Sequence, residues 1–270
     1  MESNGERENL LAATSSTDAD NMTAPNLPIL EGNTLPLRDG DRMDADEFLR
    51  RYAVDPVVYS AELLQGVVHI TRRRERRGCA EVIRPGITFE QGTSHGKLNA
   101  FLGVFAAYTP GVQGCAPATT ILPSKTTCLE PDILLRILPE HGGASTIGND
   151  TFIHGVPELL AEISFSSGAR DFGKKFDAYQ ADGVPEYLVW RTAEKEIHWF
   201  ALKRKKYVAL KPHADGTLRS EVFPGLWLDV TALLAGNLAK VLATLQLGIT
   251  SPEHAAFVAK LQKTASRRKK

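Results

Sequence analysis

Two carboxylates stand where the sequence predicts the strands of a sheet core. Asp132 heads an apolar strand, and Glu162 lies inside the apolar run 159–165. Such a run is typical of a buried central strand, where a lone carboxylate costs several kcal/mol unless it is neutralised, paired or bound to a metal. On neighbouring strands the two side chains would form an oxygen-rich site for Mg²⁺ or Mn²⁺. A second interpretation stays open, in which Glu162 pairs with a cation such as Arg136.

A lysine on the next helix can reach these carboxylates. At 100° per residue, three aromatic residues define the inward face of a helix predicted from about residue 170 to 181: Phe172, Phe176 and Tyr179. Lys175 lies about 70° from the centre of that face, whereas Lys174 points to solvent. An ammonium group beside a metal-bound water suits phosphodiester hydrolysis.

A serine motif offers a competing chemistry. Residues 92–96 fit the G-x-S-x-G pattern of serine hydrolases, with Ser94 as the nucleophile. That pattern needs a strongly apolar strand before the serine, but residues 88–91 are half polar, and no later Asp and His suggest a triad. A serine hydrolase is therefore the weaker alternative. Thr93 or Ser94 is instead expected to cap the following helix.

Strands and helices alternate along the chain and predict the scaffold. Asp44 is expected to cap a short helix, and Gln65-Gly66 to join two strands within residues 59–70. Further strands are expected at 119–122, 132–137, 159–165, 186–191, 196–202 and 207–210, and helices at 94–108, 170–181, 233–247 and 252–263. Residues 141–150 are expected to be a flexible stretch. Interleaved strands and helices predict the α/β class, with one mixed β-sheet flanked by helices.

Composition restricts the class of protein. The chain of 270 residues is 43% hydrophobic and 24% charged, which excludes collagen-like, disordered and membrane classes. Its first residues lack the apolar core of a signal peptide. Three widely spaced cysteines, Cys79, Cys115 and Cys128, form no CxxC pair and are expected to be reduced thiols. These features predict a cytoplasmic protein without an organic cofactor.

Charge and composition divide the chain into three parts. Residues 1–40 are rich in small polar residues and are expected to form a disordered N-terminal segment. Residues 41–235 are the predicted α/β domain, and residues 236–270 a helical C-terminal extension with a basic tail. The first 60 residues hold 12 acidic and 5 basic residues, whereas the last 70 hold 4 acidic and 13 basic ones.

Two basic segments are candidate contacts for nucleic-acid phosphates. The first is expected in a solvated loop at the end of a hairpin and contains Arg72, Arg73, Arg74, Arg76 and Arg77. The second contains Lys203 and Arg204 and continues to Lys206. Contacts of this kind hold the backbone without selecting a base sequence.

Five stretches of sequence follow one another in a specific order and spacing. They are AELLQGVV at 61–68, EPDI at 130–133, GVPELLAEIS at 155–164, the set Asp171, Lys175 and Tyr179, and GVPEYLVW at 183–190. Together they resemble the Uma-type putative restriction endonuclease family, a bacterial branch of the PD-(D/E)XK nucleases, over roughly residues 43–234. The resemblance implies a restriction-endonuclease-like core and a metal-dependent endonuclease that hydrolyses DNA. It also implies a metal site formed by Asp132 and Glu162, with Glu62 contributing.

One departure from the superfamily pattern concerns the lysine. The E-x-K motif would place it at position 164, where this chain has Ser164. The resemblance and the helix-face argument both transfer its role to Lys175. His95 resembles a family position near the substrate cleft, although the favoured interpretation is a structural histidine. The alternative function is a non-catalytic nucleic-acid-binding or interaction protein that retains the nuclease fold. A homodimer would provide the two sites that cutting both strands requires.

Overall fold

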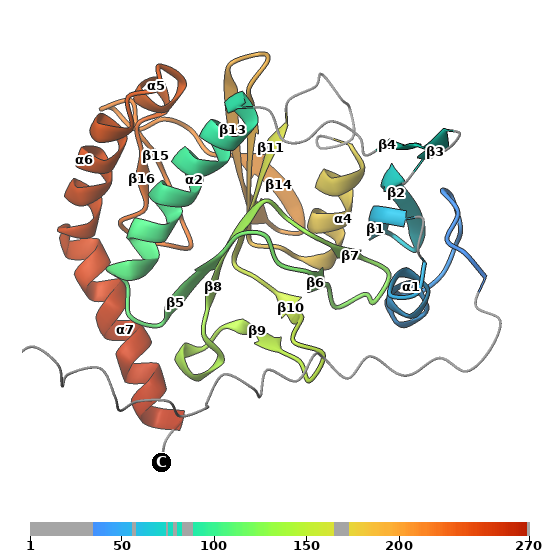
Figure 1. The fold of residues 1–270 in the computed structure, drawn as a ribbon. Coiled ribbons are helices and arrows are strands. Elements are labelled where there is room, and N and C mark those ends of the chain that lie inside the picture. The colour runs from blue at the N-terminus through green and yellow to red at the C-terminus, as the bar shows by residue number, and fades with distance from the viewer. Residues whose placement is uncertain are drawn as a thin grey trace, which may run out of the picture.

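The computed structural model describes residues 35–55, 58–73, 75–77, 80–82, 89–164 and 173–268. Two six-stranded sheets form the centre of this part of the chain, and helices cover them (Figure 1). The α/β class with mixed sheet and flanking helices is therefore confirmed. The expectation of one sheet is wrong, because several strands of two to four residues build a second sheet and are too short for a periodic pattern to reveal.

The first sheet, called the central sheet below, has the order β14-β13-β12-β11-β8-β5. Its strands are β5 (Val112–Cys115), β8 (Ile133–Ile137), β11 (Leu159–Ser164), β12 (Glu186–Arg191), β13 (Glu196–Lys203) and β14 (Lys206–Ala209). Strands β11 and β12 are parallel, and the other neighbours are antiparallel. All six residues of β11 are buried, as its apolar run predicts.

The second sheet has the order β2-β1-β7-β6-β10-β9. Its strands are β1 (Val58–Leu64), β2 (Val67–Arg73), β6 (Thr120–Ile121), β7 (Cys128–Leu129), β9 (Ala144–Ile147) and β10 (Ile153–Val156). The hairpin β1–β2 turns at Gln65 and Gly66, whose φ angles of 50° and 76° are left-handed, as a two-residue hairpin loop requires. The predicted turn is thus confirmed.

Helices cover the two faces of the central sheet differently. The described α-helices are α1 (Ala45–Tyr52), α2 (Phe89–Ala107), α4 (Lys174–Asp182), α5 (Val230–Leu234), α6 (Leu238–Ile249) and α7 (Pro252–Arg268). Of these, α1 packs on the second sheet. One apolar cluster joins one face of the sheet to α2, α5, α6 and α7. A second cluster joins the other face to α4 and to residues of the second sheet. No helix among the described residues is long and apolar enough to cross a membrane.

Several predicted boundaries differ from the structure. Helix α2 begins at Phe89 rather than near Ser94. The predicted helix 233–247 is broken, because Gly236 adopts a φ of 76° and Asn237 caps α6 through its side chain. The stretch 141–150 contains the end of a 3-10 helix, η1 (Pro139–His141), and strand β9.

Two segments near the N-terminal end of the predicted domain carry structure that the sequence did not indicate. Leu37 is buried and packs with α1, so packed residues begin before Met43, while residues 1–34 lie outside the described chain. Arg72 and Arg73 end β2, and β3 (Glu75–Arg77) pairs with β4 (Ala80–Val82). The expected loop is therefore wrong for the described part of this segment, which excludes Arg74, because these residues form strands.

Glu186 connects β12 to the small sheet of β15 (Leu218–Arg219) and β16 (Trp227–Leu228). Its buried carboxylate accepts hydrogen bonds from Trp199 Nε1 at 3.1 Å and Ser220 Oγ at 2.7 Å. It also accepts from the backbone N–H groups of Glu221 and Val222. Burial raises the pKa of Glu186 to about 7, although the hydrogen bonds oppose the shift.

This raised pKa predicts a pH-dependent stability. The native state holds the Glu186 proton more tightly than the unfolded chain, so its contribution to the free energy of unfolding falls as pH rises from about 4.5 to about 7. Glu186→Gln should unfold more easily at about pH 5, by about 1–3 kcal/mol, because the amide nitrogen cannot accept hydrogen bonds. The difference from wild type should shrink toward about pH 8, in urea denaturation series.

Glu221→Gln is the matched control, since the Glu221 side chain is exposed and pairs with Lys203. It should change the free energy of unfolding by less than about 0.5 kcal/mol. A Glu186→Gln deficit that stays constant across this pH range would contradict the prediction.

Candidate active site

Asp132 and Glu162 face each other across neighbouring strands of the central sheet. The antiparallel register pairs Leu160 with Leu134 and Ala161 with Ile133, so the next pair is Glu162 with Asp132. Asp132 Oδ2 accepts a hydrogen bond of 2.7 Å from the backbone N–H of Ile163. That bond holds the aspartate against the strand that carries the glutamate.

Lys175 and Tyr179 hold the buried carboxylate of Glu162. Glu162 is 4% exposed, and its Oε1 accepts from Lys175 Nζ at 3.0 Å and from Tyr179 OH at 2.7 Å. The two donors lie one turn apart on α4, which places them on the same side of the helix. Lys174 is exposed, so the structure orients both lysines as the helix-face argument predicts.

Burial has the largest effect on the pKa of Glu162. Desolvation raises the pKa of Glu162 to about 8, while the charge of Lys175 and the Tyr179 hydrogen bond act to lower it. The charges of Asp132 and Glu62 raise it further, which shows that three carboxylates share this site. Burial and the charge of Glu162 also raise the pKa of Tyr179 well above 10, so its hydroxyl stays a donor.

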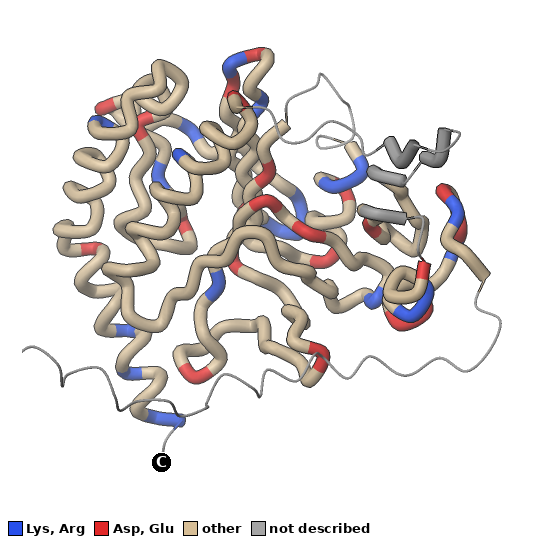
Figure 2. The backbone as a smooth tube through the Cα atoms, viewed as in Figure 1, with Lys and Arg blue, Asp and Glu red and all other residues tan. Residues whose placement is uncertain are grey.

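Glu62 lies on the other side of Lys175. Its Oε1 is 3.1 Å from Lys175 Nζ, so the ammonium bridges a carboxylate of β1 and one of β11. Lys175 thereby connects a strand of the second sheet to a strand of the central sheet through two ion pairs. Figure 2 shows acidic positions at the centre of the molecule beside the basic start of α4.

His95 approaches the site from the opposite helix layer. Its Nε2 is 3.9 Å from Asp132 Oδ1, and about a third of its side chain is exposed. His95 lies inside α2 rather than at its start. It is therefore close enough to affect Asp132 or a group bound there.

The donor set fits one hard cation. Among the described residues, no group donates a hydrogen bond to Glu162 Oε2, the second carboxylate oxygen, and the charge of Asp132 disfavours ionisation of Glu162. A divalent cation between the two carboxylates would relieve that repulsion. Within the described ranges no cluster of three His, Cys, Asp or Glu side chains is arranged to hold a metal. Mg²⁺ commonly takes one or two carboxylates and completes its shell with water and substrate phosphate.

Arg136 is not the cation that pairs with Glu162. It lies two residues along β8 from Leu134, where the register places it opposite Glu158, and its charge lowers the pKa of that residue against the effect of burial. Glu162 does pair with a cation, as the second interpretation expected, but the partner is Lys175. Metal binding at Glu162 stays a prediction. Sequence reasoning placed Tyr179 on the inward face but missed its hydrogen bond to Glu162.

The serine-hydrolase pattern does not form a nucleophile elbow. Residues 92–96 all lie within α2, whereas the elbow is a strained turn between a strand and a helix. The cap expected at Thr93 or Ser94 is also wrong, since the Thr93 hydroxyl donates to Phe89 O within the first turn.

The two basic segments lie in different places. Arg72 and Arg73 end the strand that pairs with the Glu62 strand. Lys203 and Arg204 lie at the β13–β14 turn, at the end of the central sheet opposite to Glu162, because β13 runs antiparallel to β12. Lys203 forms an ion pair with Glu221 at 2.7 Å. Asp171 lies outside the described residues.

Comparison with known families supplies the context for this geometry. Residues 76–231 match the family model Uma2, described as "Putative restriction endonuclease". That match covers more than half of the chain. The chain belongs to the Uma2 family. The resemblance stated from the sequence is thereby confirmed, and family membership together with the mixed α/β fold suggests a restriction-type nuclease with a nucleic-acid substrate.

A solved structure shows a weaker likeness. The chain is similar to a protein from Anabaena variabilis ATCC 29413 whose crystal structure is described as a putative nuclease belonging to DUF820. The identity is 10%, the TM-score is 0.46, and the match covers 75% of this chain and 99% of that one. No curated protein sequence matches the chain.

The lysine bridge predicts a specific loss of stability. Lys175→Met would leave Glu162 and Glu62 near each other without their cation. Removing one partner of a buried ion pair costs about 3–5 kcal/mol. We expect a loss of this size in urea denaturation at about pH 9, where Glu162 is ionised, and a smaller loss at about pH 6, where it binds a proton.

Lys174→Met makes the same change on the exposed side of α4. It should lower the free energy of unfolding by less than about 0.5 kcal/mol. Adding Glu162→Gln to Lys175→Met should recover part of the lost stability, because the unpaired charge is removed. Equal losses in the two lysine variants would refute the buried bridge.

Proposed function

We propose that this chain is a metal-dependent endonuclease that hydrolyses phosphodiester bonds of DNA. The observation that carries the proposal is the cluster of Asp132, Glu162 and Lys175 on one face of the central sheet, within a chain of the Uma2 family. Asp132 and Glu162 are the proposed ligands of Mg²⁺ or Mn²⁺. Such a cation supplies an activated water and stabilises charge on the scissile phosphate.

The protein groups have distinct proposed roles. Lys175 orients Glu162 and places an ammonium group where negative charge develops on the phosphate. Tyr179 fixes the same carboxylate oxygen, which leaves Oε2 for the cation. Glu62 holds Lys175, and its charge also reaches Glu162, which supports a contribution to metal binding. Lys175 thus replaces the lysine that the superfamily carries at the position of Ser164.

The proposal extends to the DNA backbone. His69 on β2 pairs with Glu62 on β1. Arg73 lies four residues further along β2, a distance of about 13 Å for a strand. A duplex at the carboxylates would pass the arginines from Arg72 to Arg77. Lys203 and Arg204 would contact a more distant part of the backbone. We further propose a cytoplasmic homodimer with a nuclease domain at 41–235, followed by a helical extension at 236–270.

Cleavage assays test the proposal directly. With Mn²⁺ or Mg²⁺, the wild-type chain should cut plasmid or single-stranded DNA, and EDTA should stop the reaction. Asp132→Asn and Lys175→Ala should each lower the rate by about 100-fold or more, since each removes a group that stabilises transition-state charge. Lys174→Ala is the matched lysine control and should retain the wild-type rate.

Binding of Mn²⁺ separates catalysis from fold. Calorimetry should show one Mn²⁺ site per chain in the wild type and Lys174→Ala, with weaker binding in Asp132→Asn. Cleavage lost in Asp132→Asn but kept in Lys175→Ala would assign the lysine role to another residue. Absence of both cleavage and Mn²⁺ binding in a folded wild-type chain would favour the non-catalytic nucleic-acid-binding protein.

The salt dependence of DNA affinity tests the proposed backbone contacts. Each phosphate neutralised by a basic side chain adds about 0.9 to the negative slope of log K against log salt. Arg72→Gln with Arg73→Gln should therefore reduce the slope by about 2 on duplexes of any sequence. Lys125→Gln, in the turn after β6, serves as the control, and an unchanged slope in the arginine variant would remove these two contacts.

A further inference from the structure

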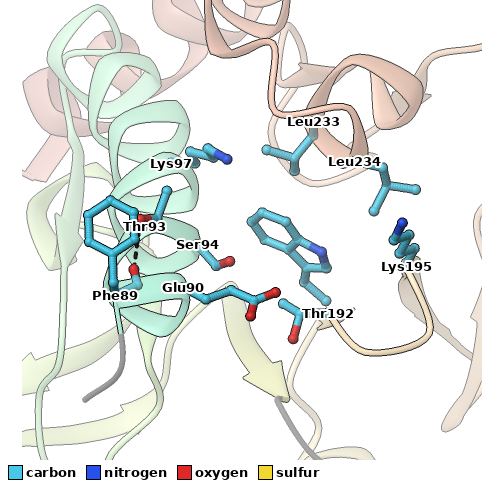
Figure 3. Close-up of a pocket in the computed structure, with 10 residues that line it drawn as sticks. Phe89, Glu90, Thr93, Ser94, Lys97, Thr192, Lys195, Leu233 and Leu234 are labelled. Carbon is cyan, nitrogen blue, oxygen red and sulfur yellow. Dashed lines mark hydrogen bonds between the residues drawn. The ribbon is translucent and has the colours of Figure 1, made fainter. Parts of the chain in front are cut away.

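A pocket of about 260 Å³ lies at the same end of the central sheet as the active site. Its walls come from the first half of α2, the end of β12, the β12–β13 turn and α5 (Figure 3). Apolar side chains form part of the lining: Phe89, Trp190, Leu233 and Leu234. The remainder is polar: Glu90, Thr93, Ser94, Lys97, Thr192 and Lys195.

Two connections link the pocket to the carboxylate site. Both the backbone N–H and the hydroxyl of Thr192 donate to Ser164 O, at 3.0 and 3.1 Å, and Ser164 is two residues beyond Glu162. On α2, Ser94 lines the pocket while the adjacent His95 approaches Asp132. Consecutive residues of a helix point about 100° apart, so the same turn of α2 lines the pocket and approaches Asp132.

The charged groups around the pocket are not paired with one another. Neither Lys97 nor Lys195 forms an ion pair with a described residue. Lys97 Nζ lies next to the turn between α5 and α6, since a Cβ on Gly236 would be 3.3 Å from it. Figure 3 shows Lys97 and Lys195 well separated around the pocket, with the Glu90 carboxylate near Thr192. Two cations and one acid therefore face this space.

Aromatic surface adds a second kind of contact. Phe89 is 92% exposed, so nearly the whole surface of its ring is open to a ligand. Trp190 and Leu233 are buried and offer the pocket only part of their surface. An exposed ring, an apolar wall and hydroxyl groups match a nucleobase, which stacks on aromatic rings and forms hydrogen bonds at its edge.

We propose that this pocket binds an unstacked nucleotide of the DNA strand that is cut. The base lies against Phe89 and the apolar wall, and Glu90, Ser94 and Thr192 bind its polar edge. Lys97 and Lys195 contact the flanking phosphates. The proposal deepens the proposed function and rests on it, since it takes DNA as the substrate. It makes DNA with unpaired bases the preferred substrate class.

The size and charge of the pocket favour a nucleotide over a bare anion. A volume of about 260 Å³ is just below the roughly 300 Å³ at which pockets for drug-sized ligands begin, so it suits one small planar group. A phosphate ion alone would leave the apolar wall unused and would face the Glu90 carboxylate. A paired base cannot enter, because its edge and faces are occupied in the duplex.

The test measures binding without catalysis. Full-length Asp132→Asn in EDTA is titrated with two fluorescent duplexes that differ only in one bulged 2-aminopurine. The bulged DNA should bind at least about 10-fold tighter than the paired DNA. The emission of its 2-aminopurine should change as the base leaves its neighbours. Phe89→Ala should weaken binding of the bulged DNA by about 5- to 150-fold, as expected for loss of one stacking contact.

Matched variants separate the pocket from general effects. Tyr108→Ala removes another exposed aromatic ring just beyond the far end of α2. Lys125→Ala removes an exposed lysine in a turn with a φ of 56°, close to the 55° of Lys195. Both should keep the preference for bulged DNA, whereas Phe89→Ala and Lys195→Ala should abolish it. Thermal unfolding confirms that each variant is folded.

The outcomes distinguish the two proposals. A preference lost in the pocket variants supports the pocket, even if the wild type with Mn²⁺ cuts neither duplex, in which case the proposed nuclease activity fails alone. Equal affinity for the two duplexes in a wild-type chain that cuts DNA overturns the pocket and leaves the nuclease intact. A preference that survives in Phe89→Ala and Lys195→Ala also overturns it.

Discussion

The neutralisation of one buried carboxylate organises this molecule. Glu162 lies in a strand whose six residues are all buried, where water cannot solvate its charge, and burial raises its pKa. Lys175 and Tyr179 supply the compensating contacts. Because an unpaired charge there would cost several kcal/mol, α4 must follow β11 with its inward face against this residue. The position of Glu62 follows, since the same ammonium needs a second carboxylate in its buried environment.

The site is therefore built from three parts of the fold, of which the hairpin β1–β2 is distant in sequence from the other two. The central sheet brings Asp132 opposite Glu162, α4 adds the lysine and tyrosine, and the hairpin β1–β2 adds Glu62. Helix α2 approaches from the remaining side with His95. The polar cluster keeps one oxygen of Glu162 engaged by donors and leaves the other without one in the described chain. This asymmetry is the basis on which a cation is proposed to bind at Glu162.

Part of this site is predictable because its signals are local. The apolar run around Glu162 indicates a central strand, and helical periodicity separates Lys175 from Lys174. The pairing of Glu162 with Lys175 rather than Arg136 needs the register of β8 and β11, which no local pattern encodes. The second sheet was missed because strands such as β6 and β7 contain only two residues. The pocket around Ser94 and Thr192 was missed because its residues come from segments about 100 positions apart.

The sequence by itself determined the family, the α/β class and the candidate set of Asp132, Glu162 and Lys175. It could do so because buried strands and amphipathic helices leave periodic patterns, and because family motifs are contiguous. The tertiary structure alone decided that Lys175 lies between Glu62 and Glu162. It also decided that the described arginines of the first basic segment lie in strands rather than in a loop, and that Ser94 lies inside a helix. Those outcomes depend on strand register and on packing between layers, which are set by contacts between residues far apart in the chain.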